Sequence, residues 1–193
     1  NKSHAAAYSL LAYHTGWLKV HCTAEFYAAN MTIEMGDTDK LKVLLVDAKQ
    51  FGITFTPPDV NLCVHRFEPA PGRAGDKLIH YGLGAVKGTG QGAVEAIVAA
   101  REGRTEQSEV ARPFTSIFDF AKRVDRSRVN KRVVDALVKA GAFDALHPDR
   151  ASTLASVGLA FEWADAQAAH AQQGGLFDFG GADEHGASTQ EPA

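Results

Sequence analysis

Hydrophobic residues recur at helical spacing over most of the chain. In residues 1–35 this spacing fits two helices that are separated near Cys22 and Thr23, and Thr23 is the expected cap of the second helix. Thr38 is expected to cap a third helix, which Gly52 ends. The apolar positions are Ala5, Tyr8, Leu11, Ala12, Leu18, Phe26 and Met31 in the first two helices, then Leu41, Leu44, Leu45 and Ala48 in the third.

The pattern changes after Gly52. Pro57 and Pro58 interrupt the helical register. Residues 67–81 read as two short strands joined by a turn rich in proline and glycine. These features predict a small β-hairpin in a chain that is otherwise mainly helical.

The stretch 81–100, YGLGAVKGTGQGAVEAIVAA, predicts a short apolar element, a tight glycine turn and a helix that begins near Gln91. Gly88 and Gly90 allow sharp bending and close approach of another backbone. The unpaired amides of the helix start and the neighbouring Lys87 favour phosphate binding. This is the helix-hairpin-helix pattern, which grips nucleic-acid backbones without reading sequence. A glycine turn that only joins two packed helices remains the alternative.

The remaining elements follow the same helical spacing. Residues 101–112 read as an exposed polar loop, and two further helices are expected around 114–121 and 129–140. The second of these ends in a turn at Gly141, which we interpret as a second hairpin of the same plan. A last helix is expected from Ala151 to about Ala171. Residues 172–193 are rich in glycine, acids and small polar residues and are expected to be largely disordered.

Composition is that of an ordinary globular protein, but charge is unevenly distributed. Hydrophobic residues make up 45% and charged residues 22%, and the formal net charge is −3. Six of the residues from Lys122 to Arg132 are cationic and one is acidic, whereas no lysine or arginine follows Arg150. Two cysteines without metal spacing and no apolar run of about 20 residues favour a cytoplasmic, non-membrane protein. The start at Asn1 suggests a piece of a longer chain.

Several collinear motifs together resemble the alpha (catalytic) subunit of bacterial DNA polymerase III, a C-family replicative polymerase. These motifs are NKSHAAAY (1–8), WLK (17–19), AEF (24–26), PPDVN (57–61), YGLGAVKGTG (81–90), KRVVDALVKAGAFDAL (131–146) and QGGLF (173–177). The resemblance implies a mainly α fold in three parts. Residues 1–80 would end the fingers domain, 81–150 would form a tandem helix-hairpin-helix unit, and 151–193 would carry a helix and a flexible tail.

The resemblance also implies a role in DNA replication. The chain would be a non-catalytic portion of a DNA-directed DNA polymerase, a nucleotidyltransferase. Its expected partners are duplex primer-template DNA, the sliding clamp (the beta subunit) and other holoenzyme subunits. The palm domain with its catalytic aspartates lies upstream in that family, so we expect neither catalytic residues nor a metal site here. Mg²⁺ is expected for the complete polymerase.

Candidate binding residues fall in three groups. Lys2, Ser3 and His4 are expected to contact the incoming nucleotide, with a simple polar helix start capped by Ser3 as the alternative. The second group is expected to bind DNA and comprises Lys87, Gly88, Thr89, Gly90, Arg126, Arg128, Lys131, Arg132 and Gly141. For its basic residues, the alternative is a solvated charged face that binds no phosphate.

The third group is Gln173, Leu176 and Phe177 of the QGGLF motif. A polar segment that displays two large apolar side chains is expected to dock into a hydrophobic pocket of the clamp. The alternative is that the apolar pair folds back on its own helix. For the chain as a whole, the alternatives are a free-standing helix-hairpin-helix repair enzyme, such as a base-excision glycosylase, and an adaptor whose hairpins grip protein.

Overall fold

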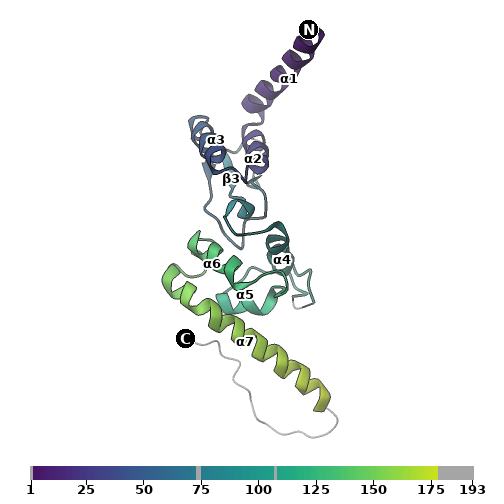
Figure 1. Cartoon of the computed structure of the whole chain (residues 1–193), viewed down its shortest axis with the longest axis vertical. Coiled ribbons are helices and arrows are strands. Elements are labelled where there is room, and N and C mark those ends of the chain that lie inside the picture. Colours follow the sequence, from purple (N-terminus) through teal and green to yellow (C-terminus); the bar gives the residue numbers. More distant parts are fainter. Residues whose placement is uncertain (1, 73–74, 107, 178–193) are drawn as a thin grey trace.

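The computed structural model describes residues 2–72, 75–106 and 108–177, with side chains up to residue 170. Within these ranges the chain is mainly helical with one small sheet, as the sequence predicts, and it is elongated, with α1 and α7 at opposite ends (Figure 1). The elements are α1 (Lys2–His21), α2 (Thr23–Ile33), α3 (Thr38–Gln50), β1 (Thr54–Phe55), β2 (Glu68–Pro69), β3 (Leu78–His80), the 3₁₀ helix η1 (Leu83–Ala85), α4 (Gln91–Arg101), α5 (Ile117–Arg123), α6 (Lys131–Lys139) and α7 (Arg150–Phe177).

The first three helices lie where their spacing predicts them, but two of the expected caps are wrong. Cys22 occupies the N-cap of α2, and the Thr23 hydroxyl donates backwards to the carbonyl of Val20. Asp37 rather than Thr38 caps α3, because its carboxylate accepts from the amides of residues 39 and 40, each at 3.1 Å. Gly52 ends α3 as expected, with a left-handed φ of 81°.

The predicted β-hairpin is present, and a third strand joins it to make a three-stranded sheet. β2 and β3 pair antiparallel, and β1 pairs parallel with the other edge of β3, which gives the order β1-β3-β2. β1 is only two residues long and precedes the proline pair, so no alternating pattern announced it. The sheet packs with α2 and α3 around a first core of Ala24, Tyr27, Ala28, Met31, Leu41, Ala48, Ile53, Phe67 and Ile79.

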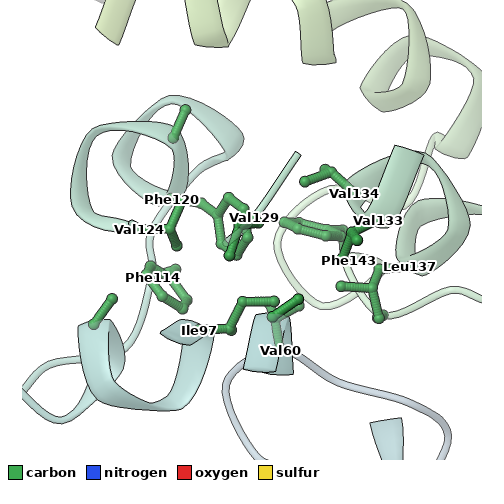
Figure 2. Close-up of a cluster of buried hydrophobic side chains, with 14 of the residues drawn as sticks. Val60, Ile97, Phe114, Phe120, Val124, Val129, Val133, Val134, Leu137 and Phe143 are labelled. Atoms are coloured by element: carbon green, nitrogen blue, oxygen red, sulfur yellow. The ribbon is translucent and has the colours of Figure 1, made fainter. Parts of the chain in front are cut away.

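A second, larger core lies under α4, α5, α6 and the first half of α7 (Figure 2). Phe114, Phe120 and Phe143 meet edge to face at its centre, with ring centroids 4.9 and 5.0 Å apart. Val60 inserts from the segment after the prolines, and its amide donates to the Ala142 carbonyl at 2.9 Å. The second core therefore draws on residues from Val60 to Ala164.

The described part of the segment between α4 and α5 is largely exposed, as the sequence predicts, but hydrogen bonds at Ser108 and Arg112 also fasten it to the core. Arg123 is 2% exposed and donates to the Ser108 hydroxyl and to the carbonyls of Ala100 and Arg112. Asp119 accepts from Arg123 at 3.0 Å and from Arg112 at 2.7 Å. Polar loop composition hid these contacts, because burial here depends on an arginine that lies further along the chain.

The C-terminal helix is longer than the sequence predicts. α7 continues to Phe177, six residues beyond the expected end near Ala171. Residues 178–193, which the sequence predicts to be disordered, lie outside the described residues. In the described part of the chain, no helix combines the length and the apolar character needed to cross a bilayer.

Candidate nucleic-acid interface

The first hairpin is a compact turn between η1 and α4. Thr89 closes it: its hydroxyl lies 2.6 Å from each of the carbonyls of Leu83 and Val86, and its amide donates to Val86 at 3.1 Å. Gly88 has a left-handed φ of 95°, a conformation that favours glycine. The Thr89 side chain, predicted to contact DNA, is buried, so it shapes the turn from inside.

The start of α4 is open to a ligand. Gly90 occupies the N-cap and supplies no side-chain acceptor to the first turn. A Cβ added at Gly90 or Gly92 would meet nothing within 4 Å. Another backbone can therefore come close to the amides at this helix start, as the sequence predicts.

The second hairpin lies at residues 124–130 rather than at Gly141. It connects the end of α5 to the start of α6, just as the first hairpin connects η1 to α4. Asp125 accepts from the amide and hydroxyl of Ser127, and Asn130 caps α6 by accepting from Val133 at 3.1 Å. The turn contains no glycine, so glycine spacing gave no signal for it.

Gly141 has a structural role in the connection to α7. It is buried, has a φ of 88°, and the guanidinium of Arg150 occupies the space beside it. Arg150 also donates to Asp144 and to the Lys139 carbonyl, and the hydrogen bond with Arg150 lowers the pKa of Asp144. This packing places Gly141 away from the surface, and its predicted contact with DNA stays a prediction.

A groove of about 790 Å³ runs between the first hairpin and α6. Three exposed cations line it, Lys87 from the hairpin and Arg132 and Lys139 from α6, against one acid, Asp135. The two walls are close together, because a Cβ at Gly88 would lie 3.7 Å from that of Ala136. The structure thus brings Lys87, Gly88 and Arg132 together, as the sequence predicts.

Lys139 is the cation of this groove that the sequence reasoning missed. It follows Arg132 by seven residues, which is about two helical turns, so both side chains share one face of α6. That spacing was a readable signal.

The other predicted cations point elsewhere. The Arg126 guanidinium lies 3.7 Å from the ring centroid of Phe161 and pairs with Asp165 of α7 at 3.1 Å. Arg128 lines a separate cleft of about 680 Å³ that contains acids as well as cations. Lys131 is exposed beside Gly158 of α7. The run from Lys122 to Arg132 is therefore divided among several environments.

The remaining predicted residues lie far from this groove. Lys2, Ser3 and His4 begin α1, at the end of the molecule opposite α7 (Figure 1), and the His4 ring contacts that of Tyr8 at a tilt, with centroids 4.3 Å apart. Gln173, Leu176 and Phe177 fall in the last turns of α7, where the structure describes the backbone but not the side chains. Among the residues described, no three His, Cys, Asp or Glu side chains gather where they could hold a metal ion.

Comparison with known proteins agrees with this geometry. The model of the helix-hairpin-helix motif family matches residues 52–153, just over half of the chain. The chain belongs to the helix-hairpin-helix family. The matched region contains both hairpins, the groove and the part of the second core that precedes α7.

Longer relatives match nearly the whole chain. DNA polymerase III subunit alpha of Neisseria meningitidis serogroup B is 49% identical over 92% of this chain. The subunits of the same name from Vibrio cholerae and Escherichia coli K12 are 43% and 40% identical over 100% of it. In each case the chain spans 15% of the relative's own length.

Proposed function

We propose that this chain is a portion of a DNA polymerase III alpha subunit that grips the backbone of duplex DNA during template-directed synthesis in the cytoplasm. The observation that carries this proposal is the groove that brings Gly88 of the first hairpin together with Lys87, Arg132 and Lys139, two residues before the open start of α4 at Gly90. Phosphates are bound by such amides and cations, and none of these groups reads a base.

The polymerase chemistry belongs to other parts of the complete subunit in this proposal. Nucleotidyl transfer would use Mg²⁺ held by paired carboxylates. Among the described residues, no three His, Cys, Asp or Glu side chains gather as a metal-binding group. The expected contribution of the chain is position and grip: it holds the primer-template duplex, together with the other subunits of the replicative complex.

The groove is tested by the salt dependence of DNA binding. We expect residues 1–193 to bind short duplexes of unrelated sequence equally well, with affinity falling steeply as salt rises. The triple variant Lys87→Ala, Arg132→Ala, Lys139→Ala should reduce the slope of log K against log salt by about 0.9 for each phosphate that the groove no longer neutralises. Fluorescence anisotropy of a labelled duplex measures both quantities.

The matched control is the double variant Lys42→Ala, Lys49→Ala, which removes exposed cations from α3, outside the groove. It should leave the slope unchanged. An unchanged slope in the groove variant would show that the groove does not bind the phosphates. Excision of a damaged base by the chain alone would favour the repair-enzyme alternative.

The second part of the proposal is that Gln173, Leu176 and Phe177 dock on the sliding clamp. It is supported by two large apolar side chains among small and polar residues at the end of α7. Burying them contributes about 1.5–3 kcal/mol each before ordering costs, so a short peptide should bind in the micromolar range, about −8 kcal/mol.

Calorimetric titration of the clamp with a peptide of residues 172–193 provides the measurement. The double change Leu176→Ala, Phe177→Ala should abolish binding, whereas Asp178→Asn should not. Equal binding of the alanine peptide would leave the segment as a linker.

A further inference from the structure

The first half of α7 is built into the helix-hairpin-helix unit. Its buried apolar side chains are Val157, Ala160, Phe161 and Ala164, a spacing of three, one and three residues that forms one continuous stripe. The stripe faces the second core, and Trp163 beside it meets Phe118 of α5 edge to face at 5.8 Å. This half of the helix therefore moves with the hairpins as one body.

Two polar anchors fix the direction of α7. At its start, Asp149 accepts from the amides of residues 151 and 152, and Arg150 ties the first turn to the end of α6 through Asp144 and the Lys139 carbonyl. Further along, Arg126 from the second hairpin stacks on Phe161 and donates to its carbonyl, at 3.1 Å, and to Asp165. Hydrogen bonds and a stacked ring restrain rotation as well as position.

The second half of α7 leaves the body of the protein. Beyond Ala164 no described side chain is buried, and the helix continues without a break to Phe177. Thirteen residues at 1.5 Å each carry its end about 20 Å past the last core contact. Figure 1 shows this half extending beyond α5 and α6.

We propose that α7 is a rigid arm that sets the distance and the rotational position of the clamp-docking segment relative to the DNA groove, with Arg126 as its positioning residue. This inference rests on the proposed function. A clamp that encircles the duplex is already oriented by the DNA. A docking segment held at the correct angle therefore meets its pocket at a higher effective concentration than one on a flexible tether.

Insertions into the exposed part of the arm test its rotational role in the complete polymerase. Two alanines after Ala169 would turn the end of the helix by about 200° and advance it by about 3 Å, whereas four would turn it by about 40° and advance it by about 6 Å. We expect the two-residue insertion to reduce the length of the DNA products that the polymerase synthesises with the clamp at least about tenfold. The four-residue insertion should reduce this length much less. Affinity for the clamp without DNA should stay unchanged in both.

The outcomes separate the arm from the docking segment. If the two-residue insertion is no worse than the four-residue insertion, the arm is not a rotational device and this inference is overturned, while docking stands. If Leu176→Ala, Phe177→Ala leaves clamp affinity unchanged, the docking segment is wrong and the arm is wrong with it.

Arg126 is tested by two variants that distinguish an anchor from a phosphate ligand. Arg126→Met should shorten clamp-dependent products and leave the salt slope of DNA binding unchanged. Asp165→Asn, which removes only the partner carboxylate, should act in the same direction more weakly. A fall in slope of about 0.9 for Arg126→Met, or tighter DNA binding for Asp165→Asn, would show that Arg126 serves the phosphates and would overturn its positioning role.

Discussion

Glycines in this chain are required for two different reasons. Gly82 has an ordinary φ of −75°, but an added Cβ would lie 2.8 Å from the backbone at Arg66 and Phe67. Gly88 has room for a side chain, since its nearest neighbour would be 3.7 Å away, but its φ of 95° disfavours one. The first glycine lets η1 pack on the segment leading to β2, and the second allows the hairpin to turn.

Gly82→Ala is expected to lower the free energy of unfolding by about 1–3 kcal/mol, because backbone atoms cannot move aside as a flexible side chain can. Urea denaturation followed by circular dichroism measures the change. Gly36→Ala is the matched control, since its Cβ would meet nothing within 4 Å. Equal stability of the two variants would contradict the close approach at Gly82.

Among the larger elements, the network of Arg112, Asp119 and Arg123 joins α5 to the end of α4 and to the connecting segment. Burial alone would raise the pKa of Asp119, but hydrogen bonds from both arginines and from the Thr115 amide outweigh it, and the pKa is lowered. Arg123 also lies 4.6 Å from the centroid of the Phe114 ring. The paired charges are therefore satisfied where they are buried.

The lowered pKa makes part of the stability dependent on acid. Because the folded pKa lies below the unfolded value of about 3.9, the stabilising contribution is complete above that pH and is lost as the pH falls through the folded pKa. Asp119→Asn should cost about 3–5 kcal/mol at pH 7, since it leaves Arg123 buried without its counter-charge, and should flatten the decline below about pH 4.

Urea titrations between pH 7 and pH 3 provide the measurement for Asp119→Asn. Glu109→Gln, an exposed change on the same connecting segment, is the control and should follow the wild type at each pH. The same acid-induced decline in Asp119→Asn and wild type would show that Asp119 is not the group responsible.

For the whole molecule, the proposed contacts are distributed along the long axis, with the start of α1 and the end of α7 at opposite extremes (Figure 1). α1 has no buried residue. Its C-terminal end is held by Lys19, which pairs with Asp47 at 2.6 Å and lies 4.5 Å from the Phe51 ring centroid. The hydrogen bond that Lys19 donates, followed by the one that Tyr27 donates, lowers the pKa of Asp47. These contacts direct Lys2 away from the DNA groove.

If Lys2 contacts the incoming nucleotide, Lys2→Ala in the complete polymerase should raise the KM for nucleotides by about tenfold, which corresponds to one charge-assisted hydrogen bond of about 1.4 kcal/mol. DNA binding without nucleotide should change little, because the groove lies elsewhere. Steady-state kinetics separate these effects, with Lys42→Ala as the control. Wild-type kinetics in Lys2→Ala would show that Lys2 does not contact the nucleotide and is only a polar residue at the start of α1.

The sequence by itself determined the helices and the first hairpin, because both depend on neighbours along the chain. Helical spacing located α1 to α4, and two glycines beside Lys87 identified the open turn before Gln91. The caps were less certain, since Asp37 and Thr38 compete for the same amides and only backbone geometry selects between them.

Only the tertiary structure decided what each cation of the basic run does. Arg123 is buried among carbonyls, Arg126 pairs with Asp165, 39 residues away, and Arg132 reaches the groove with Lys87. Nothing in the local pattern distinguishes these arginines. Whether an arginine is buried, paired or open to a phosphate depends on the partner that folding brings beside it, and that partner can be far away in sequence.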